Sequence, residues 1–353
     1  MNATTDLNAL FAMGKTPGEL GFVMPIETST HACCWMAWPH DDHPDAWGRT
    51  VSAVQRAFVR VATAISRFEP VRVVAHPEVA ADARRALPAN IDVVGIPQDD
   101  IWFRDTGPLF VKNSDNQLVA SNLVFNNWGG KFHDNEAVDD AGVGAALARH
   151  LSVPLYASPL CGEGGGIHVD GDGTAITTET CLLNANRNAG MSRKDVENEL
   201  FHALGVRKVI WLPGDDGEWI TDGHIDGMMT ICAPGKVIFE NNPDSSNPRH
   251  EVCQENLRAL RAQTDAKGRA FDIGLIEEAH MVEAANDHTA LSYVNAYIAN
   301  GGVVMPGFNT PTDDAARHIF ERGFPGREIV QVEILDICPA GGGIHCITQQ
   351  QPA

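Results

Sequence analysis

The chain has 353 residues, of which 44% are hydrophobic, and this length is sufficient to bury a large core. Its formal net charge of −20 disfavours nucleic acid and anionic membranes as partners, and it mildly favours cationic small molecules. No apolar run approaches the roughly 20 residues that a membrane-spanning helix needs, and the eight cysteines form no CxxC pair, so we expect a cytoplasmic protein with reduced thiols.

Apolar residues recur at three- and four-residue spacing in six segments, and this periodicity predicts amphipathic helices. In chain order these segments are residues 51–68, 78–87, 141–151, 193–204, 250–262 and 313–324. Runs rich in β-branched residues predict strands at residues 71–75, 91–95, 208–212, 236–240, 302–305 and 329–334. The alternation of helices and strands predicts an α/β architecture. No linker-like tract divides the chain, so we expect a single catalytic domain over residues 1–353.

Glycine is concentrated in three segments that also contain ionisable residues, at positions 162–173, 221–227 and 341–346. Because glycine has no Cβ, it lets the backbone approach a ligand closely, so reactive side chains beside it are site candidates. The string GGGIH occurs twice, at 164–168 and at 341–345. A short glycine-rich match can arise by chance, but it also fits two related strand-and-loop units that face a shared centre.

Cys346 directly follows the second GGGIH string, at 341–345, which includes Gly343. It lies near the start of a predicted last strand at residues 344–348. A lone cysteine is more often a small buried hydrophobe than a nucleophile. The other cysteines lack a comparable combination of glycine loop and ionisable neighbours. Cys346 is therefore the candidate nucleophile.

His224 and Asp226 are two residues apart, and in an extended segment such residues project to the same face. This face would hold a proton carrier and a carboxylate together. The alternative is a surface turn, because Asp-Gly dipeptides commonly form turns.

The segment 98–108 places Trp102 and Asp105 three residues apart, with Arg104 between them, on what we expect to be a loop at the rim of a site. A carboxylate beside an aromatic wall suits a planar cation, which can donate paired hydrogen bonds and stack on the ring. In the alternative interpretation, Arg104 simply pairs with an acidic neighbour.

Nine segments, taken in order, resemble the agmatine deiminase family, which is related to bacterial peptidylarginine deiminases among the guanidino-group-modifying enzymes. The segments are MPIE (24–27), WMAWPHDD (35–42), DDIWFRDTGP (99–108), FNNWGGK (125–131), EGGGIHVDGDGT (163–174), CLLNANRN (181–188), TDGHIDG (221–227), ANGGVVMPGF (299–308) and GGGIHCITQQQP (341–352). The resemblance implies a five-bladed α/β propeller with pseudo-fivefold symmetry around a polar pocket. It also implies a reaction without a metal or another cofactor.

By this resemblance, Cys346 is the nucleophile, His224 the acid and base, Asp105 and Asp226 the groups that hold the guanidinium, and Glu163 the group that orients the histidine. A guanidinium has a pKa above about 12, so its carbon resists attack unless the charge is held and the nucleophile is anionic. The expected products are ammonia and a ureido compound, formed through a thiouronium intermediate.

The resemblance identifies the residues at the guanidinium, but it does not identify the residue that binds the distal end of the substrate. Family members that use agmatine carry an acidic residue four positions before the histidine, whereas this chain has Ile220, preceded by Trp219. Glu218 or Asp216 could supply the carboxylate instead, or the substrate could be free or N-modified arginine. An arginine carboxylate would need a cation, and the candidates are Lys131, Arg104 and Arg187. The residues expected to contact the substrate are Trp102, Asp105, Asp226, Trp219, Ile220, Lys131 and Gly343.

Two other functions stay open at this point. A metal-dependent ureohydrolase could be built from His168, His224, His345 and carboxylates, although binuclear sites normally have denser Asp/His clusters. A guanidine-binding module without catalysis is the other. The expected partner is a small cationic guanidino substrate rather than nucleic acid or a membrane, and a homodimer is one expected state because relatives often form dimers.

Overall fold

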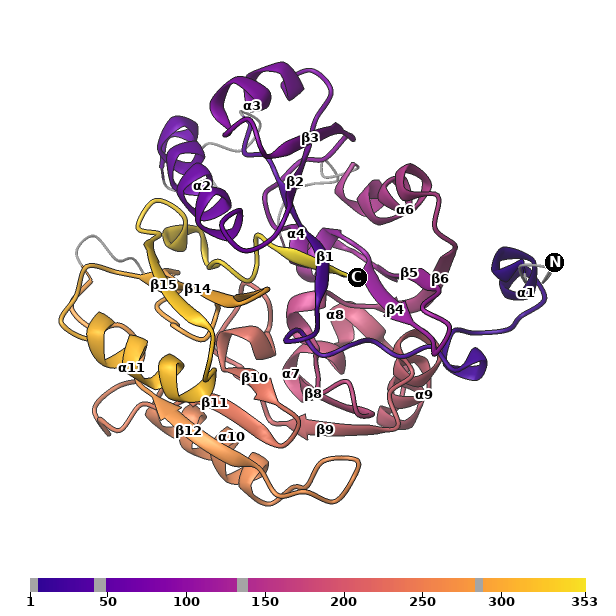
Figure 1. Ribbon diagram of the computed structural model, residues 1–353. Helices are drawn as coiled ribbons and strands as arrows, with labels where there is room; N and C mark the ends of the chain where they lie inside the picture. The colour runs from indigo at the N-terminus through magenta and orange to yellow at the C-terminus, as the bar shows by residue number, and fades with distance from the viewer. Residues whose placement is uncertain (1–5, 41–48, 132–138, 283–287) are drawn as a thin grey trace.

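The computed structural model describes residues 6–40, 49–131, 139–282 and 288–353, and its strands form five small sheets in this part of the chain (Figure 1). The last two residues of the WMAWPHDD segment lie outside the described residues. The sheet orders are β16-β1-β2-β3, β4-β5-β6, β7-β8-β9, β10-β11-β12 and β13-β14-β15. In each sheet a central strand pairs antiparallel on one side and parallel on the other, as β5 does with β4 and β6. The architecture is therefore mixed α/β.

The strands alternate with helices along the chain, as the sequence predicts. The strands are β1 (His31–Ala37), β2 (Val71–Ala75), β3 (Asp92–Gly95), β4 (Leu109–Lys112), β5 (Leu118–Val124), β6 (Leu155–Cys161), β7 (His168–Val169), β8 (Thr174–Thr178), β9 (Lys208–Leu212), β10 (Met229–Ala233), β11 (Lys236–Glu240), β12 (Asp272–Ile276), β13 (Tyr297–Ala299), β14 (Gly302–Gly307), β15 (Glu328–Glu333) and β16 (Gln349–Pro352). The helices are α1 (Leu7–Ala12), η1 (Gly18–Leu20), α2 (Val51–Ile65), α3 (Ala80–Ala86), α4 (Phe103–Thr106), α5 (Asn127–Gly130), α6 (Asp140–Leu151), η2 (Gly164–Gly166), α7 (Glu179–Leu182), α8 (Ala185–Asn188), α9 (Arg193–Leu204), η3 (Ile225–Gly227), α10 (His250–Arg261), α11 (Asp313–Gly323) and η4 (Cys338–Ala340).

All six predicted helices are confirmed, with ends that shift by three residues or fewer, and their apolar stripes face the sheets. In α2 the side chains of Val54, Phe58 and Val61 are fully buried, as their three- and four-residue spacing requires. Thr50 caps the first turn of this helix by accepting the backbone N–H of Ala53. The large helices lie toward the outside of the molecule and the sheets lie nearer its middle (Figure 1).

The six predicted strands are confirmed as β2, β3, β9, β11, β14 and β15, but the predicted last strand at residues 344–348 is wrong. Those residues form a turn, in which the backbone N–H of Thr348 donates to the carbonyl of His345 (3.1 Å) and the Thr348 hydroxyl donates to that of Ile344 (2.8 Å). The last strand, β16, begins at Gln349, directly after this turn. β16 pairs antiparallel with β1, so the last strand of the described chain lies beside the first in one sheet.

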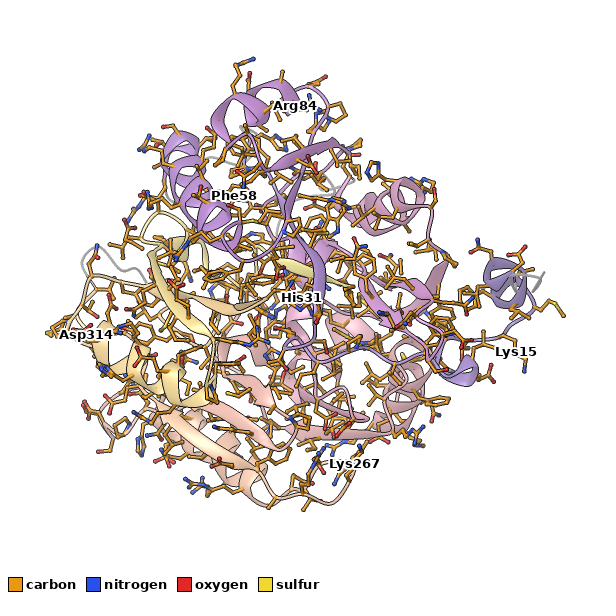
Figure 2. All side chains as sticks on the ribbon, viewed as in Figure 1. Lys15, His31, Phe58, Arg84, Lys267 and Asp314 are labelled. Atoms are coloured by element: carbon orange, nitrogen blue, oxygen red, sulfur yellow. The ribbon has the colours of Figure 1, made fainter. Side chains whose placement is uncertain are left out.

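Side chains fill the space between the sheets, and the labelled charged residues at the periphery are exposed while His31 in the middle is buried (Figure 2). The largest apolar cluster extends from α2 to the last strands and includes Cys346 at its polar edge. Within the described ranges, no helix has the length and apolar character needed to cross a membrane.

Candidate active site

A cavity of about 370 Å³ brings together segments that are far apart in the sequence. Cys346, His224 and Asp226, which the sequence singles out, all line it. Asp105 and Glu163 lie directly behind them, and each of these five residues is at most 9% exposed. The structure therefore brings the five predicted catalytic residues into one buried group.

Cys346 lies in the turn before β16, and Asn295 and Arg104 hold the backbone of this turn. The side-chain oxygen of Asn295 accepts the N–H groups of His345 (3.0 Å) and Cys346 (3.2 Å), and the backbone N–H of Arg104 donates to the Cys346 carbonyl (3.0 Å). The side-chain amide of Asn295 also donates to Cys346 Sγ (3.2 Å). These contacts fix the sulfur at the cavity wall.

The thiol of Cys346 donates to Asp226 Oδ2 at 3.6 Å. Burial raises the pKa of this thiol well above its usual value, and the carboxylates of Asp226 and Asp105 raise it further. The neutral thiol form of Cys346 is therefore favoured.

His224 lies between two carboxylates. Its Nε2 is 3.2 Å from Glu163 Oε2, and its Nδ1 is 4.0 Å from Asp105 Oδ1. Burial opposes a charge on the imidazole, but Asp105, Cys181 and Glu163 outweigh it and raise the pKa of His224 well above its usual value. The imidazolium form is therefore favoured, as the acid in a proton transfer requires.

Glu163 is itself held by a cation, because Arg187 Nε donates to its Oε1 at 2.7 Å. Burial would raise the pKa of Glu163, but its hydrogen bond with His224 and the charges of His224 and Arg187 lower it instead. The carboxylate thus stays ionised and fixes the ring of His224.

Asp105 lies in the one-turn helix α4, and the rest of the segment 98–108 is loop, as expected. Trp128 Nε1 donates to Asp105 Oδ2 (2.9 Å), and the backbone N–H of Gly165 donates to Oδ1 (3.0 Å). The indole that contacts Asp105 is thus Trp128, whereas Trp102 packs against Gly342. Burial raises the pKa of Asp105, despite the opposing charge of His224.

Gly165 lies where the catalytic side chains converge. A Cβ at this position would lie 2.7 Å from His224 Nδ1, 2.9 Å from Asp226 Oδ2 and 3.0 Å from Asp105 Oδ1. Such distances are too short for a methyl group, so the site requires glycine here.

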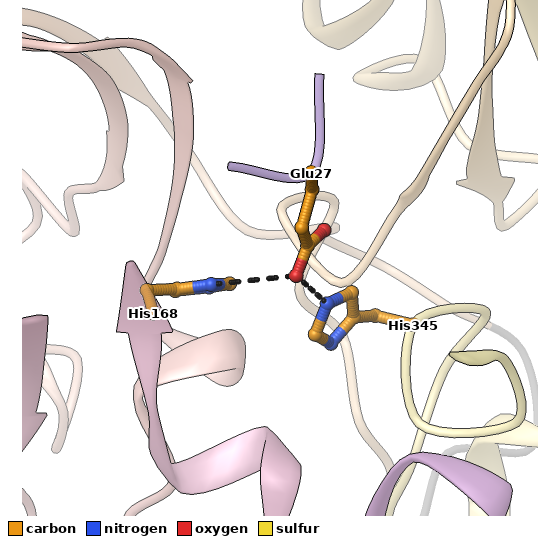
Figure 3. A group of neighbouring side chains, drawn as sticks. All are labelled: Glu27, His168 and His345. Carbon is orange, nitrogen blue, oxygen red and sulfur yellow. Dashed lines mark hydrogen bonds and ion pairs between the residues drawn. The ribbon is translucent and has the colours of Figure 1, made fainter. Parts of the chain in front are cut away.

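Asp226 contacts a second buried network, of which Figure 3 draws Glu27, His168 and His345. His345 Nδ1 is 2.8 Å from Asp226 Oδ2, and its Nε2 is 2.9 Å from Glu27 Oε1. His168 Nδ1 is 3.8 Å from the same oxygen of Glu27. The histidines of the two GGGIH strings therefore meet at one carboxylate, with ring centroids 5.4 Å apart.

The three histidines of the ureohydrolase hypothesis do not form one ligand set among the residues described. His168 and His345 group with Glu27, whereas His224 groups with Glu163 and Cys181. Both ring nitrogens of His345 already face carboxylate oxygens, as donors in an imidazolium do. The arrangement is that of a hydrogen-bonded network.

Trp219 and Ile220 line the cavity, as expected of residues near the substrate tail. Ile220 packs against Gly341, and the Trp219 ring makes an edge contact with His288. Glu218 does not replace the missing acid at Ile220, because its carboxylate accepts hydrogen bonds within its own loop, from Ile220, Thr221 and Gly223.

The three cations suggested for a substrate carboxylate are engaged elsewhere and are not among the described residues that line the cavity. Lys131 pairs with Asp222, Arg187 with Glu163 and Asp222, and Arg104 with Glu27. Gly343 packs closely against the side chain of Asn295.

Sequence reasoning missed several residues that the structure places at the site: Asn295, Gly165, His345 as a partner of Asp226, Asp215 and Arg249. The glycine crowding at 162–173 was a usable signal for Gly165. Asn295 carried none, because a single asparagine between apolar residues has no distinctive pattern.

The fold and the site together define a hydrolase of the guanidino-group-modifying class. The chain belongs to the family described as Porphyromonas-type peptidyl-arginine deiminase, whose model matches residues 23–352. The predicted family relationship is thereby confirmed.

Its relatives include agmatine deiminases along their whole length. The agmatine deiminase of Medicago truncatula is 39% identical over 96% of this chain and 98% of its own length. That of Stutzerimonas stutzeri is 39% identical over the same shares of the two chains. Among solved structures, an agmatine deiminase of Enterococcus faecalis superposes with a TM-score of 0.92 at 34% identity, covering 96% of this chain and 98% of that one.

Proposed function

We propose that this chain is a cysteine-dependent deiminase that converts a small guanidino compound, agmatine in the first instance, into a ureido product and ammonia. The observation that carries the proposal is the thiol of Cys346 at 3.6 Å from Asp226, in one cavity with His224. The agmatine deiminases among the relatives support the substrate class.

The substrate guanidinium would bring a positive charge next to Asp105 and Asp226. Asp105 and Asp226 offer carboxylate oxygens that can accept its N–H groups in pairs. Its charge would offset the two carboxylates that raise the pKa of Cys346, so arrival of the cation favours the thiolate. In this account the substrate activates its own nucleophile.

In the first half of the reaction, the thiol of Cys346 releases its proton to solvent, and the thiolate adds to the guanidinium carbon and forms a C–S bond. The released proton later converts the departed ammonia into ammonium. The tetrahedral adduct then loses one nitrogen as ammonia, and the imidazolium of His224 supplies the proton that this leaving group needs. A thiouronium attached to Cys346 results, and His224 is left neutral.

In the second half, neutral His224 accepts a proton from a water molecule as its oxygen adds to the thiouronium carbon. Collapse of this adduct breaks the C–S bond and returns the thiol of Cys346. The sum is a guanidinium plus water giving a ureido compound plus ammonium. Glu163 keeps His224 oriented through both halves.

Replacement of Cys346 tests this function. Cys346→Ala should lower the rate of ammonia release from agmatine by a factor on the order of 10⁴ or more, because the covalent route is lost. Cys338→Ala, which changes another buried cysteine near the same turn, is the matched control and should retain activity. Turnover by Cys346→Ala at the unaltered rate would contradict the proposal.

We also propose that the five sheets are the blades of a pseudo-fivefold propeller within one catalytic domain. The repeated strand order and the meeting of His168 and His345 at Glu27 support this arrangement.

A further inference from the structure

Away from Cys346 and His224, which we call the reacting end of the cavity, a further buried carboxylate lines the same cavity. Asp215 lines the cavity and is 7% exposed. Its Oδ1 accepts the backbone N–H of Gly217 (2.9 Å), but its Oδ2 accepts no hydrogen bond from any residue that the structure describes. The nearest cation to Oδ2 is Arg249, whose Nε is 3.7 Å away, beyond hydrogen-bond distance.

The charge of Arg249 is already shared with two other carboxylates. Its Nη1 is 3.2 Å from Glu240 Oε1 and 3.2 Å from Glu278 Oε2. Burial raises the pKa of Glu240 to about 7, and Arg249 limits this rise. One guanidinium thus faces three carboxyl groups, and this end of the cavity has a surplus of negative charge.

The other charged groups nearby do not cancel this surplus. The cavity lining contains three carboxylates, those of Asp215, Glu218 and Asp226. Arg249 is the single Lys or Arg among the described lining residues, and the imidazolium of His224 lies at the reacting end, so the carboxylates outnumber the cations. A substrate carboxylate would therefore meet net repulsion at this end, whereas a second positive charge would find an acceptor.

Part of the cavity wall is apolar. Ile220, Met228, Val252 and Leu291 line it and suit a chain of methylene groups. The cavity as a whole therefore matches a molecule with a cation at each end and an apolar spacer between them.

We infer that Asp215 determines specificity by accepting the distal ammonium of the substrate, so that the enzyme selects dicationic guanidino amines. This inference rests on the proposed deiminase function. Arg249 acts as a positioning residue, since it holds Asp215 at the cavity wall while its own charge is taken up by Glu240 and Glu278. The isoleucine at position 220 then supplies part of the spacer wall, and the acid comes from Asp215.

The test compares agmatine with pentylguanidine, which has the same length and a methyl group in place of the ammonium. Asp215→Asn should lower kcat/KM for agmatine by about 10- to 100-fold, as loss of a hydrogen bond between charged groups does. It should leave kcat/KM for pentylguanidine within about twofold. Asp216→Asn changes the exposed neighbouring carboxylate and is the matched control, with both substrates unaffected.

Equal losses on agmatine and pentylguanidine would overturn the inference, because Asp215 would then act on the reacting end. A higher kcat/KM of the unaltered enzyme for 4-guanidinobutyrate or arginine would also overturn it and would assign Arg249 to a substrate carboxylate. Calorimetric binding of agmatine to Cys346→Ala, with and without Asp215→Asn, separates this question from turnover. If the unaltered enzyme hydrolyses no guanidine, the proposed function fails, while a weaker Kd for the double variant would still support the tail contact.

Discussion

The imidazole of His345 has a carboxylate on each side, at 2.9 Å from Glu27 and 2.8 Å from Asp226. Burial and the charge of Arg104 oppose protonation, but the two carboxylates outweigh them and raise the pKa of His345. Burial would raise the pKa of Asp226, yet His345 lowers it. A charged His345 therefore keeps Asp226 ionised and directed toward the substrate.

This network predicts a change in pH dependence. In Glu27→Gln one carboxylate beside His345 is lost, so the pKa of His345 falls and its charge disappears at a lower pH than before. The alkaline limb of the pH profile of kcat/KM should therefore move to lower pH by about one unit. Lowering the pH should partly restore the activity of this variant, because His345 is protonated again.

A matched control exists elsewhere in the core. Glu69 is buried and its Oε2 is 3.2 Å from Nδ1 of His31, in a pair away from the cavity. Glu69→Gln should reduce the free energy of unfolding without moving the alkaline limb. An unmoved limb in Glu27→Gln would contradict the role given to His345.

At the residue scale, the sequence predicts side chains whose neighbours form a pattern. Cys346, His224 and Asp226 each stand in a glycine-rich motif, and the structure brings them to one cavity. Asn295 and Asp215 reach the site through tertiary packing of loops that have no periodic or motif signal. Their roles depend on distances across the fold, which spacing along the chain does not encode.

At the scale of elements, the short helix η2 (Gly164–Gly166) carries the backbone that fills the centre of the site. Gly165→Ala should lower kcat by about 100-fold or more, because the new methyl group would displace the side chains of His224, Asp105 and Asp226. Gly142→Ala adds a methyl group in open space on α6 and should leave kcat unchanged.

Circular dichroism and thermal unfolding should show that Gly165→Ala remains folded, since the three nearest atoms to the new methyl group belong to side chains and not to the backbone. Full activity of this variant would show that the converging atoms in the cavity are not those that react.

The elements themselves were predictable to different degrees. Helices such as α2 and α11 have one polar and one apolar face, and their periodicity locates them directly. Strands such as β1 and β8 are buried on both faces, so they lack the alternation that identifies a half-exposed strand. The turn at residues 344–348 is rich in β-branched residues. Its strand propensity is overridden because Asn295 accepts the backbone N–H of His345 and the backbone N–H of Arg104 donates to the Cys346 carbonyl.

At the scale of the whole molecule, the formal charge of −20 creates a field that attracts cations. A dicationic substrate should feel this field about twice as strongly as a monocation of the same length. We therefore expect kcat/KM for agmatine to fall more steeply than that for pentylguanidine as salt rises from about 10 to 150 mM, over which screening strengthens.

Initial rates of ammonia release at subsaturating substrate measure both slopes in one buffer series. Equal slopes for the two substrates would mean that the distal ammonium adds no electrostatic attraction, either at long range or at Asp215.

The pairing of β16 with β1 bears on how the enzyme is made. During synthesis β1 and Glu27 emerge well before their partners β16 and His345. A nascent polypeptide interrupted after Cys346 would already contain the reactive sulfur, but it would lack β16, which follows the turn and pairs with β1. Activity should therefore arise only when translation has passed residue 352, so that prematurely terminated chains are inert toward guanidines.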